Sequence, residues 1–232
     1  MNNLSLKGKK LIILVLILAV PGFLYYLLTV KGKNRYKPLA IYGPKQVAKT
    51  GHSRHGKYIP DTIYHKLPDF SLTDQLGKPV SLKTFDYKIF VVSFLYTHCS
   101  SVCNEVNKNM ERLAHAYRNN KMVRFVTITV DPERDTPQAL LAYAKPFKLS
   151  PEKWRFVTGD TTTIYNLVRN GFLVNAMKAG DEFVFSDKMI LIDADKRIRG
   201  YYTGTSLPEA MRLNDEIKVQ IAEELRKIKA PD

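Results

Sequence analysis

Cysteine is scarce in this chain, which has 232 residues and only two cysteines, Cys99 and Cys103. A closed structural zinc site requires four protein ligands, so two cysteines cannot form a four-thiolate site by themselves. The chain also has no internal repeat and no low-complexity region. Its length therefore accommodates one ordinary globular domain and a membrane segment.

Acidic residues are absent from the first 60 positions, which carry eleven Lys and Arg. The formal net charge of the chain is +14, so these eleven charges leave only +3 for residues 61–232. A nucleic-acid surface needs its basic residues on a folded face. Attraction of the amino-terminal part to anionic lipid is therefore the preferred interpretation.

Charge is also absent from residues 11–30, "LIILVLILAVPGFLYYLLTV". About 20 apolar residues suffice for a helix to cross a bilayer. The run is longer than a signal-peptide core and no cleavage pattern follows it, which favours an uncleaved anchor. Lysines lie on both sides, so the positive-inside rule leaves the orientation open. The predicted organisation is a short tail at 1–10, the anchor at 11–30, a basic stalk at 31–60 and one domain at 61–232.

The beginning of the domain alternates strand and helix patterns. "LPDFSLTDQLGKPVSL", residues 67–82, predicts a β-hairpin around the turn-prone "DQLGK". The run at 87–97 is continuously apolar, as expected for a strand buried on both faces. Apolar residues from Val102 to Tyr117 then recur at helical spacing. A strand at 123–130 and a helix starting at Thr136-Pro137 complete a β-α-β-α series, which predicts a parallel sheet.

The second half of the domain predicts four further elements. These are a strand at 154–159, a helix from 161 to about 171, a hairpin at 181–204 turning at "DADK", and a last helix at about 207–228. Residues 36–64 lack clear periodicity and are expected to form only a stalk or extended arm. The predicted fold class is α/β.

The cysteine pair lies at the junction between the strand at 87–97 and the helix that follows it, and both cysteines are expected in the first turn of that helix. Four residues apart on a helix, two side chains share one face, with Cα atoms about 6 Å apart. A disulfide or a shared metal ion is therefore possible. A structural staple is disfavoured because a loop this short constrains the unfolded chain little. Inert thiols are disfavoured because a helix start promotes thiolate. Soft thiolates suit Cu(I), so metal and redox roles both stay open.

Several motifs, in order, resemble the SCO/SenC family: an amino-terminal anchor, "LPDFSLTDQLGKPVSL", "FLYTHCSSVC", "TITVDPERDTPQALLAYA" and "WRFVTGD". The similarity covers roughly residues 60–225. The resemblance implies a thioredoxin-like fold with an amino-terminal hairpin extension, preceded by one transmembrane helix. It also implies a single-pass protein of the bacterial inner membrane, with its carboxy-terminal domain on the extracytoplasmic side.

The family binds copper and helps to assemble the dinuclear copper centre of cytochrome c oxidase. By resemblance, Cys99 and Cys103 are expected to be the copper ligands, the catalytic redox pair, or both. One departure concerns the histidine that completes the family's copper site. Counted back from "ILID", its position here is Phe185, and the chain has no histidine after His115. Copper is therefore expected to bind more weakly or exchangeably, or not at all.

The other histidines of the chain are candidate substitutes for that ligand. His98 directly precedes Cys99, but adjacent side chains diverge at a strand end. His52, His55 and His65 lie in the arm, and His115 lies on the polar side of its helix.

Most of "DPERDTP", residues 131–137, is interpreted as architecture. Asp131 and Pro132 end a strand, while Asp135, Thr136 and Pro137 cap a helix. Asp131 and Arg134 are also candidates to border the site. Trp154 and the Tyr201-Tyr202 pair are expected to serve packing.

Two functional hypotheses follow. The first is a metallochaperone that delivers Cu(I) to a cytochrome c oxidase subunit through the two thiolates. The second is an oxidoreductase that reduces the copper-site thiols of a partner, in which Cys99 attacks a disulfide and Cys103 resolves the mixed disulfide. The alternative is a general thiol–disulfide oxidoreductase or redox sensor that binds no copper. A peroxidase is disfavoured because "SFLYTHC" lacks the proline of peroxiredoxins.

Overall fold

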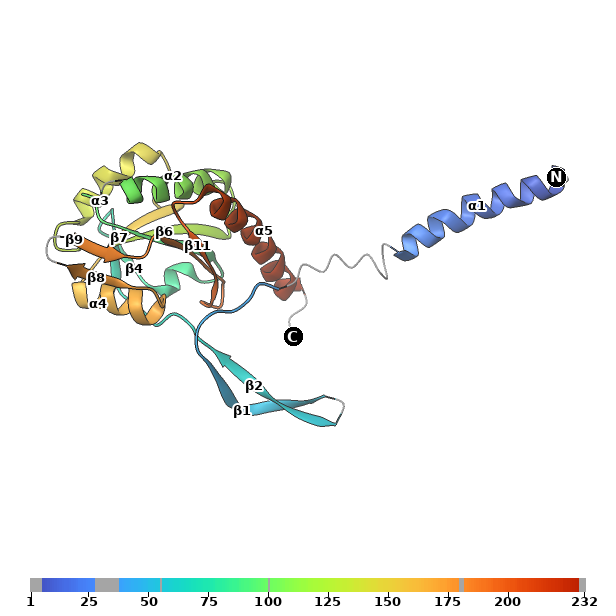
Figure 1. Ribbon diagram of the computed structural model, residues 1–232, viewed down its shortest axis with the longest axis horizontal. Helices are drawn as coiled ribbons and strands as arrows, with labels where there is room; N and C mark the ends of the chain where they lie inside the picture. Colours follow the sequence, from blue (N-terminus) through green and yellow to red (C-terminus); the bar gives the residue numbers. More distant parts are fainter. Residues whose placement is uncertain (1–5, 28–37, 55, 100, 180–181, 230–232) are drawn as a thin grey trace. The chain divides into compact units, whose positions relative to one another are not determined.

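The computed structural model describes residues 6–27, 38–54, 56–99, 101–179 and 182–229 (Figure 1). The chain divides into two compact units, Met1–Lys37 and Pro38–Asp232. In the first unit, helix α1 spans Leu6–Tyr26. Among the described residues, no helix has the length and apolar character needed to cross a membrane. The anchor at 11–30, whose last three residues lie outside the described ranges, remains a prediction from the sequence.

The second unit is built on a sheet in the order β11-β10-β5-β6-β7-β3-β4. Its strands are β3 Leu72–Asp74, β4 Pro79–Val80, β5 Ile89–Leu95, β6 Val123–Thr129, β7 Trp154–Thr158, β10 Lys188–Ile192 and β11 Ile198–Thr203. The central strands β5, β6 and β7 are parallel. Antiparallel hairpins, β3-β4 and β10-β11, flank them on either side. The parallel core and both hairpins predicted from the sequence are therefore confirmed.

Helices cover both faces of this sheet (Figure 1). On one face lie α2 Ser101–Ala116, α3 Pro137–Ala144 and α5 Leu207–Lys229. On the other lie α4 Thr161–Asn166 and the π-helical turn Leu167–Gly171. Short 3-10 turns occupy Leu82–Phe85 and Lys145–Phe147. Each residue of β5 is buried, because alternate side chains enter the two cores.

Three apolar residues of the helices are exposed, namely Val102, Met211 and Leu225. Val102 precedes the buried Cys103, Met211 follows the buried Ala210, and Leu225 follows the buried Glu224. One residue corresponds to a rotation of about 100° around a helix, which carries the side chain out of the buried stripe. Trp154 and Tyr202 are buried, so their expected packing roles are confirmed.

Two hairpins were not predicted. The expected arm contains β1 Lys45–Arg54 and β2 Lys57–Tyr64, which form a separate antiparallel sheet. The region read as one strand from residue 181 is split, because β9 Glu182–Phe185 leaves the main sheet and pairs with β8 Ala176–Ala179. In both cases the pairing depends on a partner strand whose own pattern is weak.

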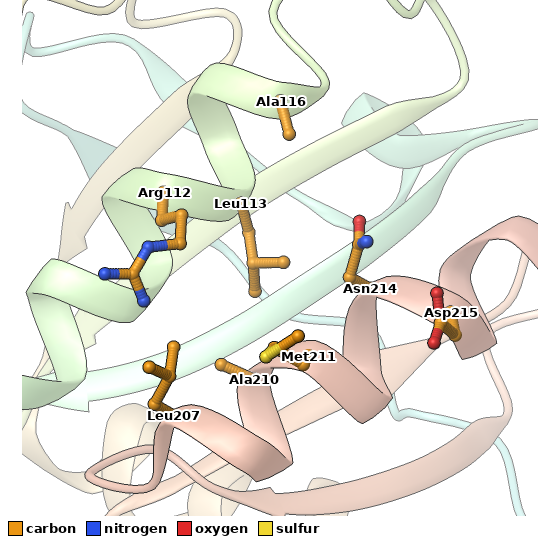
Figure 2. Close-up of a pocket in the computed structure, with 8 residues that line it drawn as sticks. All are labelled: Arg112, Leu113, Ala116, Leu207, Ala210, Met211, Asn214 and Asp215. Carbon is orange, nitrogen blue, oxygen red and sulfur yellow. The ribbon is translucent and has the colours of Figure 1, made fainter.

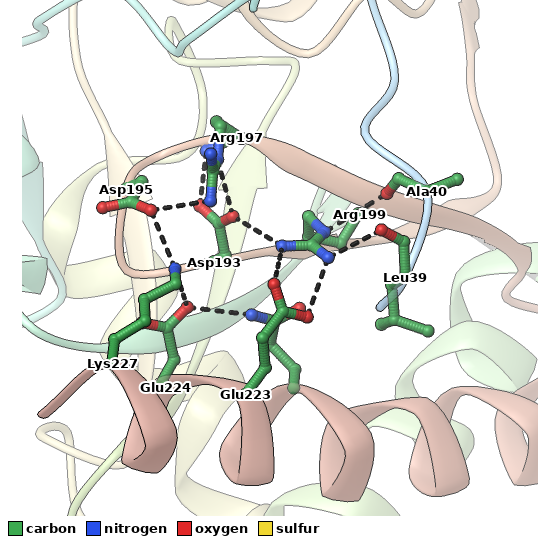
Figure 3. A network of polar contacts seen from close by, with 10 residues as sticks. Leu39, Ala40, Asp193, Asp195, Arg197, Arg199, Glu223, Glu224 and Lys227 are labelled. Atoms are coloured by element: carbon green, nitrogen blue, oxygen red, sulfur yellow. Dashed lines mark hydrogen bonds and ion pairs between the residues drawn. The ribbon is translucent and has the colours of Figure 1, made fainter. Parts of the chain in front are cut away.

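A buried arginine joins three parts of the second unit (Figure 3). The Arg199 side chain is 1% exposed and donates to both carboxylate oxygens of Glu223 on α5, at 2.9 Å. It also donates to Asp193 Oδ2 at 3.0 Å and to the backbone carbonyls of Leu39 and Ala40. The planar guanidinium presents several donors in fixed directions, which suits this set of acceptors. Arg199 therefore holds residues 39–40 against the sheet and α5.

Replacing Arg199 with methionine should lower the free energy of unfolding by about 3–5 kcal/mol, because Asp193 and Glu223 lose their shared buried cation. Urea unfolding, followed by circular dichroism, measures this change. Arg212→Met is the control, since Arg212 pairs with Glu209 and Glu216 at the surface and should cost only about 1 kcal/mol. Equal losses in the two variants would show that the buried network contributes no more than a surface one.

Candidate functional site

Cys99 and Cys103 form a disulfide just beyond the carboxyl end of β5, with Cα atoms 5.9 Å apart. The separation of about 6 Å expected from the sequence is confirmed. The expected placement of both cysteines on one helix is wrong, because α2 begins at Ser101. Cys99 lies before the helix in a turn that its own backbone N–H closes on the carbonyl of Tyr96, at 3.0 Å. This turn brings Cys99 back over the first turn of α2.

The two sulfur-bearing side chains differ in accessibility. Cys103 is 1% exposed and belongs to the core between the sheet and helices α2 and α5. Cys99 is partly exposed at the edge of the same core. In thiol–disulfide exchange, the accessible cysteine meets the partner's sulfur and the second cysteine releases the partner. Cys99 is therefore the more accessible of the two cysteines.

A buried carboxylate holds the turn that precedes Cys99. Asp135 is fully buried and accepts hydrogen bonds from the backbone N–H of Thr97, at 3.1 Å, and from the Thr97 hydroxyl. Its second oxygen also accepts from the hydroxyl of Thr129, the last residue of β6. Hydrogen bonds to a charged group are stronger than those between neutral groups. Asp135 thus ties the ends of β5 and β6 together two residues before the disulfide.

The sequence predicts Asp135 as part of a helix cap, whereas in the structure its carboxylate joins Thr97 to Thr129. The cap of α3 is Thr136, whose hydroxyl accepts from the backbone N–H of Ala139, and Pro137 follows in the first turn. One signal was available in the sequence. Parallel strands end at the same edge of a sheet, so the threonine just after β5, the threonine that ends β6 and an acidic residue in the following loop should meet.

A second polar contact links α3 to the helix that carries Cys103. Asn107, one turn beyond Cys103, donates to the phenolic oxygen of Tyr143 at 2.7 Å. Burial raises the pKa of Tyr143, the hydrogen bond from Asn107 opposes this shift, and the charge of Asp135 adds to it. The phenol therefore stays protonated at neutral pH and provides a fixed neutral contact behind the disulfide.

Aromatic side chains of the β8-β9 hairpin cover the other side of the turn. The rings of Phe183 and Phe185 lie 5.1 and 5.8 Å from the ring of Tyr96, the residue whose carbonyl closes the Cys99 turn. Lys178 of β8 pairs with Glu133, at 3.2 Å, in the loop that contains Asp135. Phe185, the position expected to differ from the family, thus belongs to an aromatic cluster beside the cysteines. An imidazole at this position would exchange ring packing for a metal-binding nitrogen.

Among the residues that the structure describes, no three His, Cys, Asp or Glu side chains are grouped to hold a metal ion. Two of the histidines proposed as substitutes have other partners: His98 lies 3.2 Å from the Thr97 hydroxyl, and His65 contacts the carbonyl of Gly171 at 2.7 Å. His52 lies 3.1 Å from Asp61, and His115 lies 3.8 Å from Glu111. His55 falls outside the described ranges. The four histidines that the structure describes therefore each have a partner other than the cysteines.

The remaining candidates of the "DPERDTP" motif stay within their loop. Asp131 is buried and its carboxylate lies 3.7 Å from the guanidinium of Arg134. Burial raises the pKa of Tyr165, the charge of Asp131 adds to this shift, and the Tyr165 hydroxyl donates to the carbonyl of Val130. These contacts support the interpretation of Asp131 as architecture of the loop that presents Asp135.

A small groove of about 160 Å³ lies between α2 and α5 (Figure 2). Its lining residues are Arg112, Leu113, Ala116, Leu207, Ala210, Met211, Asn214 and Asp215. Neither cysteine lines it, and its centre is apolar. We interpret it as the seam between two packed helices.

Comparison with known proteins adds to this geometry. A family model described as SCO1/SenC matches residues 62–220. The SCO1 protein homolog of Bacillus subtilis is 27% identical over 153 residues, which cover 64% of this chain and 79% of that protein.

Two solved structures share the fold. One, described as a disulfide switch in BsSco, a member of the Sco family of cytochrome c oxidase assembly proteins, is 25% identical with a TM-score of 0.60, covering 68% of this chain and 94% of that chain. The other, ScoI of Bradyrhizobium japonicum with copper bound, is 28% identical with a TM-score of 0.55, covering 64% and 97%.

Replacing Asp135 with asparagine should loosen the turn at Thr97, because one accepting oxygen becomes a donor that faces a hydroxyl. We expect the free energy of unfolding to fall by about 2 kcal/mol. In the reduced protein, we expect Cys99 to be alkylated about threefold faster or more, since it becomes more accessible and loses a nearby negative charge. Urea unfolding and mass-spectrometric alkylation rates provide the two measurements.

Thr136→Ala is the control for this variant, since it removes only the α3 cap and should cost about 1 kcal/mol. It should leave the alkylation rate of Cys99 unchanged. If Asp135→Asn lowered stability without changing that rate, Asp135 would support the fold alone and would not position the turn.

Proposed function

The chain belongs to the SCO1/SenC family, and we propose that it assists assembly of the copper centre of cytochrome c oxidase through Cys99 and Cys103. The observation that carries this proposal is the asymmetric cysteine pair, with a partly exposed Cys99 presented by a fixed turn and a buried Cys103 behind it. Supporting evidence comes from the solved relative described as a member of a family of cytochrome c oxidase assembly proteins.

Thiol–disulfide exchange is the route that the geometry supports best. In the dithiol form, the Cys99 thiolate attacks a disulfide of the partner and forms a mixed disulfide while one partner thiol leaves. The Cys103 thiolate then attacks Cys99 and releases the second partner thiol. Two electrons and two protons pass to the partner, and the chain returns to the disulfide seen here. The partner's thiols are then free to bind copper.

Delivery of Cu(I) as cargo is a second route, favoured by the copper bound to the related ScoI. Reduction of the disulfide would provide two thiolates within reach of one ion, and binding would release their protons. Among the described residues no group of three His, Cys, Asp or Glu side chains could hold the ion, and Phe185 lies at the position expected from the sequence for the family histidine. Weak, exchangeable binding suits an ion that is handed on. Phe185 also favours the alternative, a thiol–disulfide oxidoreductase or redox sensor that binds no copper.

We further propose that residues 11–30 anchor the chain in the bacterial inner membrane, with the domain on the extracytoplasmic side. The uncharged apolar run and the family resemblance support this location. Disulfide chemistry is also permitted in that compartment. The proposed partner is an oxidase subunit or another copper or thiol protein.

Trapping distinguishes the two cysteines. With a disulfide-bonded model peptide in excess, reduced Cys103→Ser should accumulate a mixed disulfide at Cys99, because the resolving thiol is missing. Cys99→Ser should accumulate it about tenfold more slowly or less, because Cys103 is buried. Mass spectrometry of the full chain in detergent measures both. Equal trapping, or faster trapping at Cys103, would contradict the assigned roles.

Copper affinity tests the second route. In competition with a Cu(I) chelator, the reduced full chain should bind one Cu(I) weakly, and Cys99→Ser should abolish binding. Phe185→His should tighten binding by about tenfold or more, because imidazole is a suitable third ligand.

Phe183→His is the matched control, since Phe183 packs on the same tyrosine from the same hairpin. It should leave Cu(I) affinity unchanged. Absence of Cu(I) binding in the reduced wild-type chain, with trapping at Cys99 intact, would eliminate copper delivery and leave the thiol-exchange route.

A further inference from the structure

The β1-β2 hairpin exposes apolar side chains that nothing in the described part of the chain covers. Its strands pair only with each other there, and Val47 and Tyr58 are 76% and 64% exposed. Ile59 and Ile63 are exposed as well. An isolated two-stranded hairpin is marginally stable in water. A hairpin of this kind gains stability when another surface covers it.

One face of the hairpin combines apolar, aromatic and basic side chains. Lys45 pairs with Tyr64 and Val47 with Thr62, so these residues share a face with Tyr58, two pleats further along β2. The Lys45 ammonium lies 5.6 Å from the ring centroid of Tyr64. Tyrosine and lysine with apolar stems are suited to the boundary between hydrocarbon and water.

The charge of the hairpin has one sign on this face. Residues 45–64 include four Lys and Arg, and the single acidic residue is Asp61. By the strand register Asp61 lies on the opposite face, where its carboxylate is 3.1 Å from His52. By the same register Lys57 lies on the face of Asp61, so the face of Val47 and Tyr58 presents the charge of Lys45 without a carboxylate. This distribution is complementary to an anionic surface.

The length of chain before the hairpin limits its distance from the apolar run. Arg199 holds the carbonyls of Leu39 and Ala40, and Tyr42 donates from its backbone N–H to the carbonyl of Ile198. Seven residues, 31–37, separate the apolar run from Pro38. Even fully extended, seven residues span at most about 25 Å. The segment between the apolar run and the residues held by Arg199 is therefore short in sequence.

We propose that the β1-β2 hairpin binds an anionic lipid surface through the face that carries Lys45, Val47 and Tyr58. This inference rests on the proposed membrane anchoring, which would place the hairpin next to such a surface. Lys45 contacts lipid phosphates, while Val47 and Tyr58 enter the headgroup boundary. Contact would hold the domain against the membrane, so that its reach toward a partner is restricted.

The test uses the full chain in nanodiscs of phosphatidylcholine alone, or of phosphatidylcholine and phosphatidylglycerol in equal amounts. Hydrogen exchange of the peptide 45–64 is the readout. Each basic side chain near an anionic surface contributes roughly a fivefold change in binding. We therefore expect exchange of the hairpin amides to slow about fivefold or more in the anionic discs. The difference should disappear at high salt, about 0.5 M, because salt screens these charges.

Two variants sharpen the result. Lys45→Gln/Lys49→Gln should remove the lipid dependence, while Lys78→Gln/Lys83→Gln, with the same change in charge at exposed positions elsewhere, should retain it. The salt dependence of the wild-type chain keeps the proposal testable if the first variant loses its hairpin.

Three outcomes would overturn the proposal. The first is equal exchange of peptide 45–64 in both lipids. The second is protection that rises with protein concentration in neutral discs, which would identify a second copy as the occupant. The third is protection by added RNA but not by anionic lipid. Retention of the chain in neutral discs reports the anchor, and trapping at Cys99 reports the thiol chemistry. A failure of the hairpin proposal is thereby separated from a failure of either.

Discussion

The site depends on the hydrogen bonds that the Asp135 carboxylate accepts. The carboxylate accepts them from Thr97, after β5, and from Thr129, at the end of β6. These bonds fix where the turn leaves the sheet, and the turn fixes where Cys99 stands over α2. A buried carboxylate needs several donors to offset its desolvation, and the strand ends supply them. The position of Cys99 thus depends on the alignment of two parallel strands.

The environment of the pair has two unlike sides. The polar side consists of the Asp135 carboxylate and the contact between Asn107 and Tyr143. The aromatic side consists of Tyr96 and the phenylalanines of β9. Phe185, which the sequence predicts to match the family's histidine position, contributes a ring to the packing on this side.

A second network determines how the chain enters the domain. Arg199 bonds to Asp193, Glu223 and the carbonyls of residues 39–40, and it stays buried while doing so. The hairpin β1-β2 begins five residues later. A buried cation therefore fixes the backbone of residues 39–40 a few residues before the hairpin begins.

The sequence alone determined the features that depend on local periodicity. Short patterns predicted strand β5 from its apolar run, helix α2 from the helical spacing after Val102, and the start of α3 at Thr136-Pro137. The spacing of Cys99 and Cys103 predicted the distance between their Cα atoms. These patterns could be recognised because each extends over only a few residues. The resemblance to the SCO/SenC family rested on such motifs.

Only the tertiary structure decided the role of Asp135, the exposure of Cys99 relative to Cys103, and the partners of β1 and β9. Asp135 meets Thr97, 38 residues away, because β5 and β6 lie side by side and end at one edge of the sheet. Contacts of this kind depend on strand order and register, which no short window of sequence contains.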